Sequence, residues 1–202
     1  MTITYTYGKN LYVNTTNRCD MNCTFCLRHT GDGVGTGSDL WLEREPGREE
    51  ILADIQGRSL DGLEQLVFCG YGEPAYRWDD ILWVCDRLKE SGFPLPIRMD
   101  TNGHGDLICG RPTAAEARGR LDILSISLND ATPEAYVARC RPRDGARAYE
   151  AMLEFTRQAV RAVPLVMMTV VDNMPREEIE ACRAICEGLG ARFRVRRYST
   201  EW

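Results

Sequence analysis

Three cysteines near the start of the chain are the residues whose type and spacing best suit chemistry. Cys19, Cys23 and Cys26 form a CxxxCxxC pattern shortly after a short apolar run. Thiolates are soft ligands that select iron–sulfur clusters or zinc, and most clusters are held by four cysteines. Three thiols facing one point, without a fourth nearby, therefore favour a [4Fe-4S] cluster with one iron open to another ligand.

A structural zinc site is the alternative for the same residues. His29, three residues after Cys26, would complete a closed Cys3His shell, and spacing alone does not exclude this. Cys182 and Cys186 lie one turn apart on an expected helix, but two thiols without further ligands favour core packing over a second metal site.

The overall composition is that of an ordinary globular domain. The 202 residues are 44% hydrophobic and 27% charged, which predicts one domain spanning 1–202. The N-terminus has no basic flank followed by an apolar stretch, and no segment reaches the roughly 18 apolar residues of a membrane span. Nine cysteines without disulfide-like spacing suit a reducing compartment. We therefore expect a cytoplasmic protein without a membrane partner.

Strand and helix patterns alternate along the chain. Short apolar runs predict six strands, at residues 11–16, 66–69, 96–101, 121–128, 165–171 and 192–198. Amphipathic segments predict helices at residues 49–56, 79–91, 113–120, 146–163 and 174–189, with another beginning at Pro133. Since neighbouring parallel strands need a crossover between them, the alternation predicts an α/β fold with a parallel sheet.

Polar turns follow three of the expected strands. Gly70-Tyr71-Gly72-Glu73-Pro74 comes after the second strand, and the third ends in Asp100-Thr101-Asn102-Gly103. Ser127 and Asn129 lie at the end of the fourth strand. Chemistry in parallel α/β barrels is concentrated at the carboxyl ends of strands, so we expect these turns to share one site with the cysteines.

Taken together, these motifs resemble those of the radical S-adenosylmethionine (SAM) superfamily. The three cysteines with Phe25 before the last one are similar to its cluster signature, and the turn at Glu73 is similar to its Gly-Gly-Glu motif, which holds the amino group of SAM. The turn at Asp100 resembles that of the glycyl-radical-enzyme activases, where the aspartate contacts the SAM ribose. The resemblance implies SAM contacts from Phe25, Gly70, Tyr71 (through its main chain), Gly72, Glu73, Asp100, Asn102, Ser127 and Asn129.

The resemblance also implies a fold and an activity. It implies a TIM-type partial (β/α)6 barrel of parallel strands, open on one side, in which a reduced [4Fe-4S] cluster cleaves SAM to methionine and a 5′-deoxyadenosyl radical. The radical abstracts hydrogen from a substrate, and a flavodoxin- or ferredoxin-type protein supplies the electron. Activases carry a lysine near the position of Asn129, so Arg139, Arg141 or Arg143 is expected to supply the missing cation.

A narrower resemblance concerns residues 7–14, the turn at residues 69–74 and residues 193–196. They look like small radical SAM proteins associated with TatD-type nucleases. The competing class is a non-catalytic iron–sulfur electron carrier or structural zinc-binding module, which would not need the turns at Glu73 and Asp100.

Two features bear on the substrate. The glycine-rich stretch at residues 30–48 predicts a mobile lid or a connector.

The C-terminal third of the chain is its basic part. Residues 139–202 carry 12 basic and 9 acidic side chains, against 13 and 21 in residues 1–138. Arg192, Arg194 and Arg196 alternate onto one face of the last strand. Solvent-exposed helix faces explain much of that charge, but a surface that binds an anionic partner is the functional interpretation. With no added domain after the last strand, we expect a macromolecular substrate, a protein segment in preference to a nucleic acid.

Overall fold

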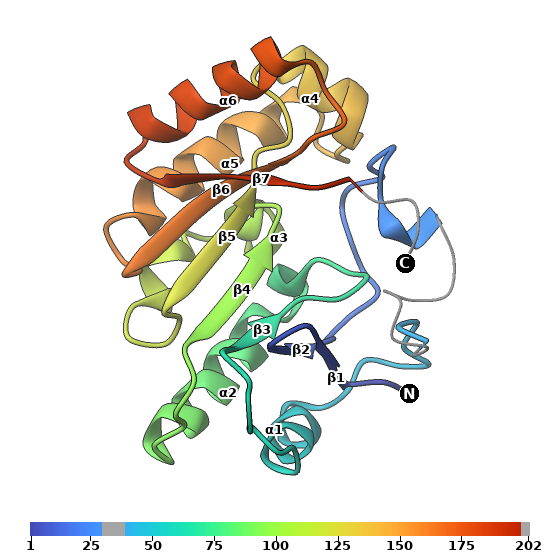
Figure 1. Cartoon of the computed structure of the whole chain (residues 1–202), viewed down its shortest axis with the longest axis vertical. Helices are drawn as coiled ribbons and strands as arrows, with labels where there is room; N and C mark the ends of the chain where they lie inside the picture. Colours follow the sequence, from blue (N-terminus) through green and yellow to red (C-terminus); the bar gives the residue numbers. More distant parts are fainter. Residues whose placement is uncertain (30–38, 199–202) are drawn as a thin grey trace.

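The computed structural model describes residues 1–29 and 39–198 of the chain (Figure 1). Its seven strands form one sheet, in the order β1-β2-β3-β4-β5-β6-β7. They are β1 (Thr4–Tyr7), β2 (Asn10–Val13), β3 (Gln65–Phe68), β4 (Ile97–Thr101), β5 (Ile123–Ser127), β6 (Leu165–Val171) and β7 (Arg192–Arg196). The strands from β2 to β7 are parallel, as expected, and the sheet stays open between β1 and β7.

The helices lie mainly along one side of this curved sheet (Figure 1). They are α1 (Arg48–Gln56), α2 (Trp78–Glu90), α3 (Gly105–Cys109), α4 (Pro133–Cys140), α5 (Ala146–Ala159) and α6 (Arg176–Gly188). The start of α4 follows its sequence signals: Thr132 Oγ1 accepts a hydrogen bond from the Ala135 amide (3.2 Å), and proline occupies the first turn. The described helices thus provide the crossovers of a partial (β/α)6 barrel.

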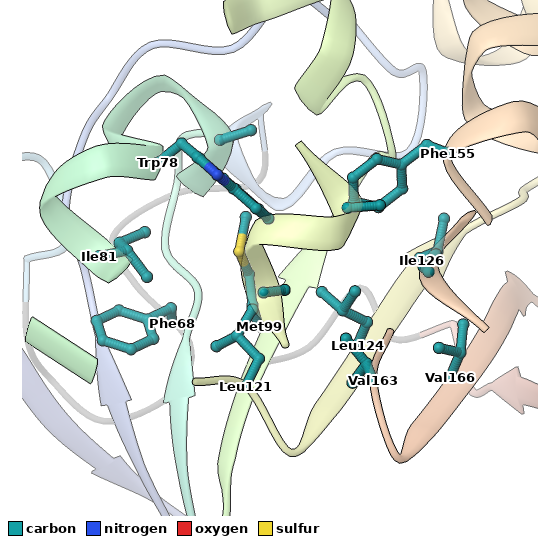
Figure 2. Packing of buried hydrophobic residues seen from close by; sticks show 14 of the residues in the cluster. Phe68, Trp78, Ile81, Met99, Leu121, Leu124, Ile126, Phe155, Val163 and Val166 are labelled. Atoms are coloured by element: carbon teal, nitrogen blue, oxygen red, sulfur yellow. The ribbon is translucent and has the colours of Figure 1, made fainter. Parts of the chain in front are cut away.

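Side chains alternate between the two faces of the central strands. Met99, Leu124 and Ile126 point toward the helices and pack around Trp78 and Phe155 in the core (Figure 2). The residues between them on β4 and β5 are polar, namely Arg98, Asp100, Ser125 and Ser127, and they line a cavity on the opposite face. The helix-covered face therefore stabilises the fold, while the other face is available for binding.

Two elements of the fold differ from the sequence prediction because they were not predicted, and a third is shorter than predicted. β1 pairs antiparallel with β2 across a tight turn in which Gly8 has φ +56°, a conformation that favours glycine. The short helix α3 was also missed. The helix expected at residues 113–120 is a single 3₁₀ turn, Ala114–Ala117, because Arg118 returns to an extended conformation.

Three further cysteines are core residues, as the sequence predicted for Cys182 and Cys186. Cys85, Cys182 and Cys186 are fully buried in the main hydrophobic cluster. Within the described ranges, no helix is both long and apolar enough to cross a bilayer.

Candidate active site

A cavity of about 490 Å³ opens at the carboxyl ends of the parallel strands. It collects every site residue expected from the sequence, although these residues come from four separate segments of the chain. They are Cys19, Cys23, Phe25, Cys26, Gly70, Tyr71, Gly72, Glu73, Asp100, Asn102, Ser127 and Asn129. The volume falls within the roughly 300–1,000 Å³ range of small-molecule sites.

The loop that carries the cysteines is fixed by the C-terminal end of α4. The amide of Asn22 donates to the Cys140 carbonyl (3.1 Å) and the amide of Thr24 donates to the Arg139 carbonyl (2.9 Å). Carbonyl groups in the last turn of a helix have no partner within the helix, so the cysteine loop satisfies them. The Arg143 amide returns a bond to the Asp20 carbonyl (2.8 Å), which ties both segments together.

The thiols themselves are held in a largely apolar setting. Burial raises the pKa of Cys19 to about 12 and also raises the pKa of Cys26. The pKa of Cys23 is raised by a hydrogen bond with the thiol of Cys140 and by burial. Metal ligation requires thiolates, so binding of a metal would release these protons. Cys140 was read from sequence only as part of a helix, and nothing local indicates that it contacts Cys23.

The donor set fits a cluster better than a closed zinc shell. Among the described residues, no three His, Cys, Asp or Glu side chains lie close enough together to bind a single metal ion. The three thiols therefore do not converge on one point as closely as the sequence predicted. A cubane spans several atoms, and its ligands stand farther apart around it. His29 is exposed and does not line the cavity, which also disfavours the Cys3His alternative. The three thiols at one cavity wall therefore suit a [4Fe-4S] cluster.

The glycines of the Gly70–Pro74 turn are required by packing within the protein. A Cβ at Gly72 would lie 2.2 Å from the Thr16 carbonyl oxygen, and one at Gly70 would lie 2.1 Å from Asn14 Oδ1. Neither glycine has a positive φ. The absence of a side chain at these two positions lets this turn sit directly on the segment leading into the cysteine loop.

Glu73 lines the cavity and also joins two of its walls. Its Oε1 accepts from the Thr101 hydroxyl (2.6 Å) and the Ala75 amide (3.0 Å), and its Oε2 accepts from the Asn102 amide (2.7 Å). Burial raises the pKa of Glu73 to about 7, although these hydrogen bonds act in the opposite direction. A carboxylate offers about four acceptor positions, so roughly one remains for a ligand ammonium group.

Asp100 forms an ion pair on the floor of the cavity. Its Oδ1 lies 2.9 Å from Arg98 Nε, two residues earlier on the same face of β4. Arg98 is nearly buried and also donates to Gln65 Oε1 (2.8 Å). Arg98 was not singled out from sequence, although its alternation with Asp100 placed it on the same face.

Asn102 lies at the cavity but uses its side chain to hold the cysteine loop. Its Nδ2 donates to Asp20 Oδ1 (2.7 Å), while its Oδ1 accepts from the His104 amide (2.9 Å). Burial works against ionisation of Asp20, but hydrogen bonds from His104 and Asn102 lower its pKa below the ordinary value. A direct contact of the Asn102 side chain with SAM stays a prediction.

Asn129 carries a buried acceptor at the cavity wall. It adopts φ +59°, its Nδ2 donates to Cys140 Sγ (3.5 Å), and its Oδ1 has no hydrogen-bond partner among the described residues. Buried carbonyl oxygens without a partner are costly, so this atom suits a ligand donor. Ser127 lines the same wall.

The cations expected near Asn129 are not at the cavity. Arg139 pairs with Asp130 (3.2 Å) and lies over the Phe25 ring, and Arg141 and Arg143 are exposed; none of the three lines the cavity. Arg139 is held within α4 by its contacts with Asp130 and Asn173, and the chain turns away after the helix at Arg141, which has φ +47°. The arginines that line it are Arg28, Arg98, Arg194, Arg196 and Arg197.

The lid expected at residues 30–48 belongs only in part to the described residues. Residues 30–38 lie outside the described residues. Those from 39 onward are anchored to the end of β2: Asn14 Nδ2 donates to the Leu40 carbonyl (2.6 Å), and Arg18 pairs with Glu45 (2.6 Å). Tyr71 packs against Trp41, with ring centroids 5.0 Å apart. The described half of the 30–48 stretch therefore packs against the rest of the protein, with Leu40 lining the cavity, and a lid at residues 30–48 stays a prediction.

Comparison with known sequences identifies a family and several relatives. The radical SAM superfamily profile matches residues 13–184. The probable GTP 3′,8-cyclase of Thermococcus kodakarensis is 30% identical over 172 residues, which are 84% of this chain and 50% of that protein. GTP 3′,8-cyclase 2 of Mycobacterium tuberculosis is 28% identical over 203 residues, covering 94% of this chain and 51% of the other. The chain thus spans about half the length of these relatives. Their names do not support the narrower resemblance to TatD-associated proteins or activases.

Solved structures share the fold at low identity. Streptococcus suis SuiB, determined with S-adenosylmethionine bound, superposes with a TM-score of 0.66 at 18% identity, covering 93% of this chain and 38% of SuiB. Methylornithine synthase (PylB) gives 0.63 at 16% identity, covering 94% and 53%. With the profile match and the assembled cavity, these findings show that the chain is an enzyme of the radical SAM superfamily, whose cofactors are a [4Fe-4S] cluster and SAM.

Proposed function

We propose that this domain reductively cleaves SAM and uses the resulting 5′-deoxyadenosyl radical to abstract hydrogen from a substrate. The observation that carries the proposal is the meeting of three cysteine thiols and the Glu73, Asp100 and Asn129 side chains at one cavity. An electron carrier or a zinc module would have no use for these polar groups beside the thiols. When bound, the cluster supplies the electron that cleaves SAM.

The residues of this chain would hold the reactants in place. Cys19, Cys23 and Cys26 would ligate three irons and leave the fourth for SAM. Glu73 would accept a hydrogen bond from the SAM ammonium through its remaining acceptor position, and Asp100 would accept from the ribose hydroxyls, both as charge-assisted hydrogen bonds. The apolar wall formed by Phe25 and Met21 would exclude water from the radical.

The test is anaerobic reconstitution with iron and sulfide, followed by addition of SAM with and without dithionite. We expect methionine and 5′-deoxyadenosine only with the reductant, and iron content should fall in Cys23→Ala. One zinc per chain with no acid-labile sulfide in protein purified without oxygen would contradict the proposal. A flavodoxin or ferredoxin in place of dithionite tests the expected physiological reductant.

Two candidates for the substrate compete. A protein segment was predicted from sequence, and full exchange protection of residues 30–47 only when that partner is present would support it. A small nucleotide is favoured by the names of the relatives, which act on GTP. The large-substrate prediction was based on the chain ending after β7, and the partial coverage of the relatives removes that support.

A further inference from the structure

The cavity extends to the open edge of the sheet, well beyond the strands that carry the expected SAM contacts. Glu73, Asp100 and Ser127 lie on or beside β3, β4 and β5, whereas Arg194 and Arg196 line the cavity from β7 and Arg197 lines it from the position just after that strand. β6 separates β5 from β7 in the sheet order. The β7 wall is therefore placed to contact a second molecule in the cavity.

The arginines on this wall have no acidic partners among the described residues. No ion pair or hydrogen bond joins the side chains of Arg194, Arg196 or Arg197 to any residue in the ranges 1–29 and 39–198. The two carboxylates that line the cavity are already engaged, because Asp100 pairs with Arg98 and Glu73 accepts three hydrogen bonds. The β7 side thus carries positive charge that the described protein does not neutralise.

Two hydroxyl side chains lie in register with one of these arginines across the adjacent strands. Ser127 is paired in register with Thr169 on β6, and Thr169 is paired with Arg194 on β7. Residues in register on adjacent strands are about 5 Å apart and share a face, so three donor groups stand side by side on the cavity wall. Arg196, two residues after Arg194, presents its side chain to the same face.

We propose that Arg194 and Arg196, with the Thr169 hydroxyl, bind an oxyanion of the substrate, a phosphate or a carboxylate. A guanidinium group offers paired donors that match either group in bidentate geometry, and the neighbouring hydroxyl adds a further donor. This inference rests on the proposed function, since it assigns a substrate class to the same cavity.

The test of this proposal is calorimetric titration of the reconstituted, SAM-loaded protein with inorganic pyrophosphate and with malonate. The ionic strength is held constant, because salt screens exposed charges. We expect one of these anions to bind, and the one that binds distinguishes a phosphate from a carboxylate. Arg194→Gln should weaken binding about tenfold or more, the loss typical of a charged hydrogen-bond partner. Arg192→Gln is the matched control: it removes the same charge from the same strand, but Arg192 does not line the cavity, so the affinity should change by less than about twofold.

The inference is overturned if neither anion binds, or if the two variants weaken binding equally. It is also overturned if Arg194→Gln loses SAM affinity to the same extent, because Arg194 would then serve the SAM carboxylate. Iron content and SAM affinity are measured on the same wild-type samples. Their loss would count against the proposed function, whereas intact values with no anion binding would count only against this inference.

Discussion

His104 Nδ1 lies 2.6 Å from Asp20 Oδ2, inside the protein, where both side chains are almost completely buried. The other ring nitrogen, Nε2, lies 2.9 Å from the Tyr136 hydroxyl. With a carboxylate beside Nδ1 and a phenol beside Nε2, we assign the proton to Nδ1 and take Nε2 as the acceptor. This row of hydrogen bonds connects the cysteine loop to the end of β4 and to α4.

The first prediction concerns this contact. His104→Ala should lower the free energy of unfolding by about 3 kcal/mol, because it leaves the buried Asp20 carboxylate without its main partner. Iron content after reconstitution should fall as well, since Asp20 lies between two cluster cysteines. His104→Asn, whose amide can still donate to Asp20, should recover part of both losses. Chemical denaturation and iron analysis provide the measurements.

A matched control is the other histidine of the chain. His29→Ala should leave stability and iron content unchanged, because His29 is exposed and lies outside the cavity. Loss of metal in this variant would revive the zinc alternative.

The second prediction concerns the pH dependence produced by Glu73. Its pKa is about 7 in the folded protein and about 4.5 as the ordinary value, so the folded state holds a proton that the unfolded state releases. Stability from this group is present below the ordinary pKa and is lost as pH rises through about 7, a change of about 3 kcal/mol. Glu73→Gln cannot ionise, so in the metal-free protein its stability relative to wild type should increase from pH 5 to pH 8. A constant difference across that range, by thermal denaturation, would contradict the assignment.

The third prediction concerns the effect of Glu73 ionisation on SAM binding. If Glu73 accepts a hydrogen bond from the SAM ammonium, affinity for SAM should increase from pH 6 to pH 8 as the carboxylate forms. In Glu73→Gln that increase should disappear while iron content is retained. Calorimetry on reconstituted protein checks both, and unchanged SAM affinity in the variant at pH 8 would remove Glu73 from the SAM site.

The fourth prediction concerns the close contact of the Gly72 turn with the cysteine segment. Gly72→Ala places a Cβ against two backbone carbonyls, at 2.2 Å from Thr16 and 2.7 Å from Arg18, so the backbone must shift. We expect a loss of about 1–3 kcal/mol in stability, together with weaker cluster retention. Gly188→Ala is the control, because no atom lies within 4 Å of the added Cβ, and it should be neutral or stabilising by up to about 1 kcal/mol. Equal melting temperatures for the two variants would show that the contact is unimportant.

The fifth prediction concerns Asp100. Asp100→Asn keeps the shape of the side chain but leaves Arg98 without a countercharge on the cavity floor. SAM affinity should fall about tenfold, because an amide is a weaker acceptor for ribose hydroxyls than a carboxylate. An affinity within twofold of wild type, by equilibrium dialysis, would assign Asp100 to the support of Arg98 alone.

The sequence predicted those parts of the fold and site that depend on local pattern. Apolar runs located the six parallel strands, and the polar turns at Glu73, Asp100 and Asn129 proved to share a cavity because carboxyl ends of parallel strands meet at one edge. The β1 hairpin was missed because residues 1–10 carry little apolar signal apart from Ile3 and the tyrosines.

Contacts between distant segments were beyond reach of the sequence. Asp20 and His104 are 84 positions apart, and neither belongs to a recognisable motif with the other. The arginines expected as cations, Arg139, Arg141 and Arg143, do not line the cavity, because the path of the chain after α4 depends on the docking of that helix. The roles of Gly70 and Gly72 in packing likewise depend on which segment lies beside them.

The bonds between the cysteine loop and the end of α4 have a consequence for biosynthesis. The loop is synthesised before α4, but the carbonyl groups that position it belong to Arg139 and Cys140, near the end of that helix. More than a hundred residues must be translated, and β5 and α4 must form, before the three thiols acquire their final arrangement. Iron–sulfur assembly factors would therefore meet a competent acceptor only after α4 has been synthesised and has docked, and earlier delivery would encounter thiols that are near in sequence but not yet fixed in space.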